Sequence, residues 1–316
     1  MNYKKIFSIT INLAFVIFLI IFFKDNASDF KKIIGIPVYY IALMVVLVIL
    51  NIYINGIKIN LLTKFYNLDL KTKQHFGLSA ITTMGNYIVP LRGGAYWRAR
   101  YLKKYHDFSY MKFMSTFSST MIITFFSSSL MGLIFTLLTY RTINPFSSKL
   151  GLIFFIALVL EILIMLFSPR LKLTKSKIIN FGINVINEWR IIRKNYTLVT
   201  KLILADIVVI LLIALRLVLT YYIIQSPIKL FPGVVIATIT MLSILINITP
   251  GGLGIKETVI VLSTSLAGAT QKAGTLVAIL DRVISVIIVF SIGIAFAYIL
   301  LKEGRKNVSK NTDINH

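Results

Sequence analysis

Cysteine is absent from the 316 residues, so the chain cannot form a disulfide, a thiolate nucleophile or a cysteine-ligated metal site. Histidine is scarce: His75, His106 and His316 are the three in the chain, and none belongs to a spaced metal-binding or catalytic-triad motif. The sequence also has no P-loop, the usual means of using ATP directly. These absences predict a protein that holds no cofactor and is not an enzyme by itself.

Acidic residues are few as well, 11 against 34 Lys and Arg, which gives a formal net charge of +23. The cations lie mostly between and beyond long apolar runs, where they fix membrane orientation and meet anionic head groups rather than nucleic acid. Hydrophobic residues make up 57% of the chain and the mean hydropathy is +0.84, which excludes a soluble globular domain. The sequence therefore predicts an all-α, polytopic helical membrane protein, with residues 1–316 as a single integral membrane domain.

Six apolar runs are long enough to be read as spans. They are Ile6–Phe23, Ile36–Ile54, Met111–Thr139, Leu150–Phe167, Leu202–Ile224 and Gly274–Leu301. Basic stretches separate them, above all Asn55–Gln74 and Ser168–Lys201, and the positive-inside rule places both in the cytoplasm. We therefore expect a multi-pass protein of the cell membrane with both termini in the cytoplasm.

A short apolar stretch, His75–Val89, is followed by Pro90, Leu91, Arg92, Gly93 and Gly94. Cationic segments flank it on both sides, and a full crossing would leave one of them outside. The pattern predicts a re-entrant segment, with Asn86 and Arg98 near its broken loop.

A second broken loop, Asn247–Glu257, contains Pro250, Gly251, Gly252 and Gly254 between two apolar runs, Val234–Ile248 and Ile255–Ala269. Proline and glycine free backbone groups that lipid cannot satisfy, so such a loop lines a cavity or forms a surface turn, and the sequence leaves both possible. We expect a hairpin that returns to the outer side, by a half-dip or by two full crossings.

The two halves share one order: a span, a broken hairpin and a long span. This order predicts an inverted repeat whose interrupted segments meet near the midplane. The units would be 36–140 and 202–301, preceded by a first span and loop (1–35), connected by 141–201 and followed by a basic tail (302–316).

Arg282 lies about 12 Å along the last span, too deep to reach water easily, so it needs a partner from another segment, either Glu257 or Asp206. It could bind a phosphate or form a structural ion pair. The guanidinium groups of Arg92 and Arg98 match the geometry of phosphate oxygens. A role in fixing the orientation of the chain in the membrane would explain both residues too. We expect Arg216 to extend to the outer surface.

Other intramembrane polar residues favour structural roles. We expect Asp206 and Glu161 to be paired structurally rather than to relay protons, and the serines of Ser115–Ser129 to allow close helix packing rather than to line a polar path. Residues Ile178–Ile192 have the spacing of an amphipathic helix, which would lie in the membrane interface or pack on the protein.

Two motifs resemble a known family. Pro90–Gly94 with Arg98, and Thr249–Gly254 with Glu257 and Arg282, are similar to the transmembrane region of the lysylphosphatidylglycerol synthases, over nearly the whole chain. The resemblance implies a flippase-like domain that handles a lipid with an anionic or aminoacylated head group. Ala95 replaces an acidic residue common in the family, and Ser118–Thr120 replace a Glu–Arg pair. The soluble catalytic domain of bifunctional members is expected to be absent.

The leading hypothesis is a flippase-like protein that binds and translocates a lipid with a phosphate-containing head group. Alternatives are a membrane component of aminoacyl-phosphatidylglycerol synthesis with a soluble synthase partner, and a non-transporting factor in envelope assembly. The predicted site residues come from both broken loops and the last span. They are Asn86, Pro90, Arg92, Gly93, Gly94, Arg98, Asn247, Pro250, Gly251, Gly252, Gly254, Glu257 and Arg282.

Overall fold

The computed structural model describes residues 36–139, 146–167, 171–243 and 249–313. Within these ranges all regular structure is helical: α3 (Val38–Phe65), α4 (Thr72–Ile88), α5 (Gly94–His106), α6 (Tyr110–Thr139), α7 (Phe146–Phe167), α8 (Lys177–Ile192), α9 (Tyr196–Ile223), α10 (Leu230–Leu242), η2 (Pro250–Gly252), α11 (Ile255–Ser263), η3 (Thr264–Ala267) and α12 (Gln271–Asp313). Five of them, α3, α6, α7, α9 and α12, contain stretches long and apolar enough to cross a membrane. The prediction of an all-α, polytopic membrane protein is therefore confirmed. The expected span Ile6–Phe23 lies outside the described residues.

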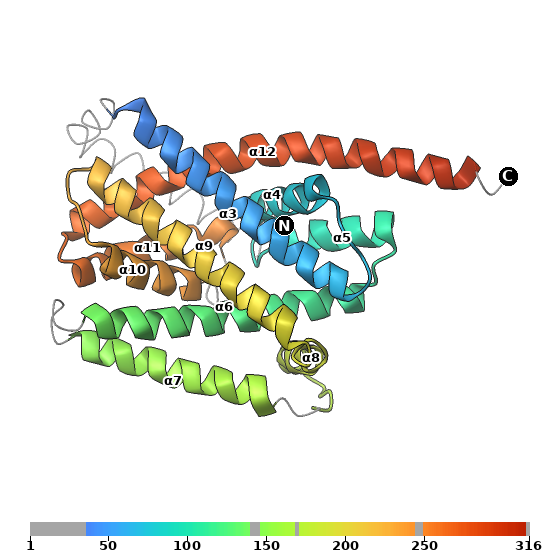
Figure 1. The fold of residues 1–316 in the computed structure, drawn as a ribbon, viewed down its shortest axis with the longest axis horizontal. Coiled ribbons are helices and arrows are strands. Elements are labelled where there is room, and N and C mark those ends of the chain that lie inside the picture. Colours follow the sequence, from blue (N-terminus) through green and yellow to red (C-terminus); the bar gives the residue numbers. More distant parts are fainter. Residues whose placement is uncertain (1–35, 140–145, 168–170, 244–248, 314–316) are drawn as a thin grey trace, which may run out of the picture.

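Helices α6, α7 and α12 run along the length of the bundle, α3 and α9 cross them obliquely, and α12 extends beyond the bundle (Figure 1). Helices α3 and α9 pack together, whereas α7 packs mainly on α6 at the edge. Much of the α7 surface is exposed apolar side chain, for example Leu152, Phe155 and Leu163. A helix this apolar on its outer face is typical of contact with lipid rather than water.

Two helical hairpins occupy opposite ends of the bundle (Figure 1). Helices α4 and α5 form one hairpin, beside the end of α3 and the start of α6, and α10 and α11 form the other, beside the end of α9 and the start of α12. The packing is reciprocal: α12 lies against α4, and α6 lies against α10. The end of α4 also contacts η2, so the tips of the two hairpins meet inside the molecule.

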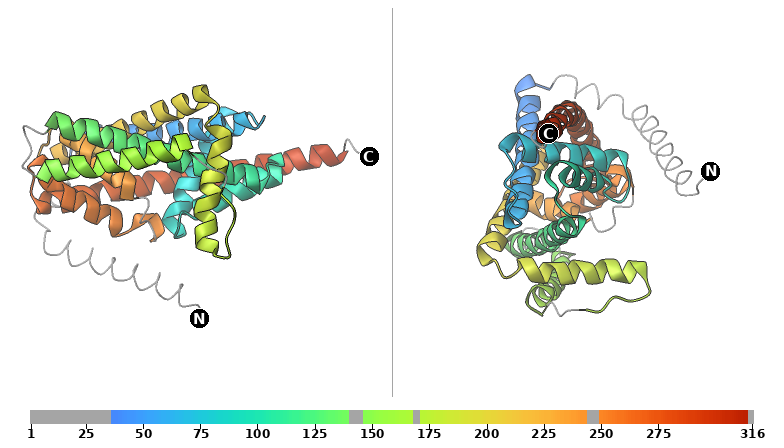
Figure 2. Two further views of the ribbon diagram at one scale, coloured as in Figure 1. Left: turned by 90° about the horizontal axis from the view of Figure 1, so that it is seen from below. Right: turned by 90° about the vertical axis from the view of Figure 1, so that its right-hand side faces the viewer.

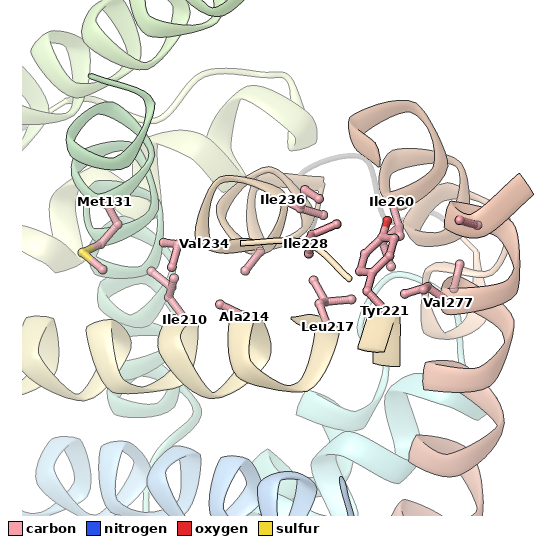
Figure 3. Close-up of a cluster of buried hydrophobic side chains, with 13 residues drawn as sticks. Met131, Ile210, Ala214, Leu217, Tyr221, Ile228, Val234, Ile236, Ile260 and Val277 are labelled. Carbon is pink, nitrogen blue, oxygen red and sulfur yellow. The ribbon is translucent and has the colours of Figure 1, made fainter. Parts of the chain in front are cut away.

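The largest apolar cluster lies where α6, α9, α10, α11 and α12 converge (Figure 3). Tyr221 is at its centre, fully buried, and its hydroxyl shares a 2.5 Å hydrogen bond with that of Thr264. A buried phenol needs such a partner. In a membrane, close packing and hydrogen bonds of this kind hold helices together, because lipid is as apolar as the side chains.

The serines of α6 are buried and lie among the helices, including Ser118, Ser119, Ser127 and Ser128. The side chains that α6 turns toward the central cavity described below are others, among them Thr116, Thr120 and Thr124. This placement favours close packing as the role of the serines.

Helix α8 runs across one end of the bundle, roughly perpendicular to the long helices (Figure 2). Trp189 and Ile192 are buried against Leu62 and Leu202, so this part of α8 packs on the protein. A position in the membrane interface is compatible with this packing and stays a prediction.

Helix α3 is longer than the predicted span Ile36–Ile54. It continues through the first part of the basic stretch Asn55–Gln74, to Phe65. Ile52, Ile59 and Leu62 continue the buried face of the helix at spacings of seven and three residues. Lys58 within this stretch is only 3% exposed.

Candidate functional site

A cavity of about 310 Å³ lies at the centre of the bundle, between the long helices and the tips of both hairpins. Hydroxyl and amide side chains make up much of its wall, for example Asn51, Thr82 and Ser285. Five cationic side chains also line it: Lys58, Arg92, Arg98, Arg216 and Lys256. Within the described part of the chain, no aspartate or glutamate lines the cavity, and no cluster of three or more metal-ligating residues occurs.

The tip of the first hairpin has a strained backbone. Leu91 and Arg92 adopt left-handed conformations with φ of 55° and 59°, which side chains other than glycine rarely do. The Asn86 amide oxygen accepts a 3.0 Å hydrogen bond from the Gly94 backbone N–H and so holds the start of α5 against α4. A Cβ on Gly94 would lie 1.9 Å from the Thr82 carbonyl oxygen. The turn therefore requires glycine at position 94, and it presents Arg92 to the cavity.

Arg92 and Arg98 have aromatic and thioether neighbours in place of carboxylates. The Arg92 guanidinium lies 5.9 Å from the centre of the Phe117 ring, and its Nη1 donates to the Met121 sulfur at 2.8 Å. Arg98 lies over Phe113 at 5.1 Å. No carboxylate of the described residues forms an ion pair with either arginine. Most of their N–H donors are consequently available to a ligand.

The second hairpin tip is built around Pro250, which is buried at the start of η2. Gly251 has a φ of 61°, and a Cβ there would also lie 2.6 Å from Cδ1 of Tyr87, on the first hairpin. Gly254, with a φ of 81°, precedes α11, and its N–H donates a 2.8 Å hydrogen bond to Oε2 of Glu257. Glu257 therefore caps the N-terminus of α11, its own helix.

Glu257 also forms an ion pair with Arg282 through its other carboxylate oxygen. The Arg282 guanidinium lies 5.5 Å from the centre of the Tyr87 ring. Arg282 therefore connects α12 with both hairpin tips. Of the two partners predicted for Arg282, the structure confirms Glu257.

The other candidate, Asp206, is fully buried and pairs instead with Lys58 of α3. It also accepts a 3.2 Å hydrogen bond from the Thr124 hydroxyl. The structural pairing predicted for Asp206 is confirmed. Glu161 accepts a 3.1 Å hydrogen bond from Ser129, which joins α7 to α6.

Arg216 does not extend to the outer surface as predicted. It is 8% exposed, and its Nε lies 2.6 Å from Oδ1 of Asp281 while Nη2 donates to Oδ2 at 3.2 Å. The same Oδ2 lies 3.6 Å from Nζ of Lys256. One carboxylate on α12 therefore holds two cavity cations, from α9 and α11, because pairing inside the protein costs less than leaving buried charges alone.

The cavity wall contains five of the predicted site residues: Asn86, Arg92, Arg98, Gly251 and Gly252. The others that the structure describes shape or support the two tips from behind the wall, and these are Pro90, Gly93, Gly94, Pro250, Gly254, Glu257 and Arg282. Asn247 lies outside the described residues.

The predicted site residues did not include three of the cavity cations, Lys58, Arg216 and Lys256. A signal existed for Lys58, because it lies within a continuous pattern of apolar residues at helical spacing. For Arg216 the signal was its position as an isolated cation within a long apolar run.

Comparison with known proteins shows which family the chain belongs to. A search of curated proteins found no match. The family described as the lysylphosphatidylglycerol synthase TM region matches residues 9–293, well over half of the chain and inclusive of both hairpins. The resemblance that rested on the two broken loops is thereby confirmed, and the chain belongs to the lysylphosphatidylglycerol synthase TM region family.

Proposed function

We propose that the protein binds a lipid with a phosphate-containing head group in the central cavity and translocates it between leaflets. The observation that supports this most directly is the set of five cationic side chains on a cavity wall without a described carboxylate. Charged side chains within a membrane are costly and are usually kept for function. Arginine in particular offers the planar fork of donors that matches phosphate oxygens.

The arrangement of the hairpins suggests how a head group would reach the cavity. If α4–α5 enters the membrane from one side and α10–α11 from the other, their tips meet at a central site that each side can open. This is the design of transporters built from inverted repeats. Units 36–140 and 202–301 would be the two repeats, and both contribute side chains to the cavity.

Charge asymmetry supports an orientation in the cell membrane. The end of the bundle beside α5 and α8 carries many cations, including Lys103, Lys104 and Lys194, whereas Lys149, Lys229 and Lys272 are at the other end. By the positive-inside rule the first end faces the cytoplasm, and the C-terminus with it. Because the chain lacks cysteine, single cysteines at 103 and 229 test this directly. A membrane-impermeant thiol reagent added to intact cells should label position 229 and spare 103, and the reverse result would invert the orientation.

The function itself is tested by reconstitution into liposomes that carry fluorescent lipids, with transbilayer movement followed by dithionite quenching. The Arg92→Gln variant should lose most movement of the cargo lipid. Arg100→Gln is the matched control, because Arg100 is exposed on α5, the helix that follows the Arg92 turn, and lies outside the cavity wall. Equal movement by all three proteins would contradict the proposal.

Absence of movement with a folded protein would favour one of the other two hypotheses. Aminoacylation of phosphatidylglycerol that appears only on co-expression with a soluble synthase would indicate a partner-dependent enzyme component. Preserved function in cells after removal of Arg92, Arg98 and Arg282 would indicate an assembly factor.

A further inference from the structure

This inference rests on the proposed function and concerns the charge of the cargo. We infer that the cavity selects a head group with two or more negative charges, a phosphomonoester or a diphosphate. Such a head group is preferred over a singly charged phosphodiester and over an aminoacylated head group.

The balance of charge around the cavity carries the argument. Two carboxylates lie behind the cavity wall and pair with three of the five lining cations. Asp206 pairs with Lys58, and Asp281 pairs with Arg216 and Lys256. Five cations against two carboxylates leave three positive charges in excess. The Arg282–Glu257 pair is neutral and changes nothing. A ligand of charge −1 would leave two charges uncompensated in a low-dielectric site, whereas a ligand of charge −2 or −3 compensates most or all of them.

The same balance disfavours a cationic head group. A lysyl or other aminoacyl group brings one or two ammonium ions, which need carboxylates or other acceptors. Both carboxylates behind the wall are already engaged, and no described acidic side chain lines the cavity itself. An ammonium ion would instead meet Arg92 and Arg98, and like charges brought together at a binding site lower affinity.

The partners of Arg92 and Arg98 point to oxygen-rich anions. The two guanidinium groups lie against Phe117 and Phe113, and Arg92 donates to a thioether, a weak acceptor. A phosphomonoester presents three terminal oxygens and a diphosphate more, whereas a phosphodiester presents two. The ligands with more charge therefore also satisfy more of the available donors.

The inference is tested by binding to the full-length protein in nanodiscs of a zwitterionic lipid, at pH 8 and fixed salt. The probes are short-chain phosphatidic acid, phosphatidylglycerol and lysyl-phosphatidylglycerol. Phosphatidic acid should bind at least about tenfold more tightly than phosphatidylglycerol, since one further charge-assisted hydrogen bond is of that size. Lysyl-phosphatidylglycerol should bind most weakly. Arg98→Gln should weaken phosphatidic acid about 10- to 100-fold and narrow the preference, while Arg100→Gln should change neither.

A pH series gives a second, independent readout. The second proton of a phosphomonoester dissociates near pH 6, so its charge changes from −1 to −2 as the pH rises through this range. Affinity for phosphatidic acid should therefore rise between pH 5 and pH 8, and affinity for phosphatidylglycerol should stay level. The charged groups that face the ligand are the five cations, with Asp206 and Asp281 behind them, and no histidine lines the cavity among the described residues.

The outcomes separate this inference from the proposed function. Arginine-dependent binding of all three lipids with similar affinity, or a preference for the lysyl lipid, would overturn the charge selectivity and leave lipid binding in place. Binding of none of the lipids, combined with no lipid movement in liposomes, would overturn the proposed function. Inorganic phosphate that binds as tightly as phosphatidic acid would support the preference for a dianion but overturn the assignment to a lipid head group.

Discussion

Glu257 has two structural roles that substitution can separate. One carboxylate oxygen accepts the hydrogen bond from the Gly254 N–H that caps α11, and the other pairs with Arg282. Glu257→Gln keeps an oxygen that can accept the capping hydrogen bond but removes the charge. Glu257→Ala removes both interactions.

The magnitude follows from burial. The side chains of Glu257 and Arg282 are both 12% exposed, so removal of one takes an ion-pair partner from a nearly buried charge. Such a loss costs about 3–5 kcal/mol of unfolding free energy. The cap contributes about 1 kcal/mol more, so Glu257→Ala should be less stable than Glu257→Gln by about that amount.

The measurement is equilibrium unfolding in mixtures of dodecyl maltoside and SDS, with Glu257→Gln, Arg282→Gln and the double variant in one thermodynamic cycle. Because the two groups are in contact, the double variant should be more stable than the sum of the single losses, by about 1–3 kcal/mol. Strict additivity would refute the pairing as an energetic unit. Equal stability of Glu257→Gln and Glu257→Ala would refute the capping role.

Two further substitutions test the packing of the bundle. Gly94→Ala should prevent the α4–α5 hairpin from forming normally, because the new Cβ would lie 1.9 Å from the Thr82 backbone oxygen. Gly151→Ala in α7 is the control and should melt within a degree or two of the wild type, because the nearest atom to its Cβ, Cγ2 of Thr136, is 3.7 Å away. A similar melting temperature for both variants would contradict the close approach at Gly94. Lys58→Met and Asp206→Leu should each lower the free energy of unfolding by about 3–5 kcal/mol. The double variant should be close to the wild type in stability, since replacement of a whole buried ion pair by apolar side chains is often neutral. A double variant as unstable as either single one would show that the pair itself stabilises the fold.

The sequence predicted the helical spans well where apolar runs were long and cations marked their ends. Met111–Thr139 and Leu150–Phe167, for example, agree closely with α6 and α7. The predicted span Ile36–Ile54 ended before Lys58, which was counted in the basic stretch Asn55–Gln74, whereas α3 continues through this lysine. A lysine can remain within a helix in a membrane protein when a carboxylate from another helix neutralises it, and Asp206 is 148 residues away in the chain. Local sequence does not reveal such a partner.

The same limit, that local sequence does not reveal distant partners, applies to the ion pairs of the candidate site. The candidate partners of Arg282 could be narrowed to Glu257 and Asp206, because few acidic residues were available in the spans. Arg216 could not be assigned to Asp281, because either end of a helix can lie near the membrane surface and sequence alone does not give its depth. The three-dimensional packing of α9 against α12 was needed to place the two groups 2.6 Å apart.

If the protein carries an anionic head group as proposed, the division of the cavity cations into two groups would keep binding reversible. Lys58, Arg216 and Lys256 have carboxylate partners, which makes their charge tolerable when the cavity is empty. Arg92 and Arg98 have aromatic neighbours, which attract a guanidinium but do not compete strongly for its N–H donors. A phosphate that enters therefore has no internal carboxylate to displace from these two arginines. It leaves again without creating an unpaired buried acid, because the acids stay bound to the other cations throughout. A cavity with a carboxylate on every cation would bind phosphate poorly, and one with none would be too costly to fold. The mixture is therefore consistent with the proposed function, in which the protein would both capture and release an anionic head group.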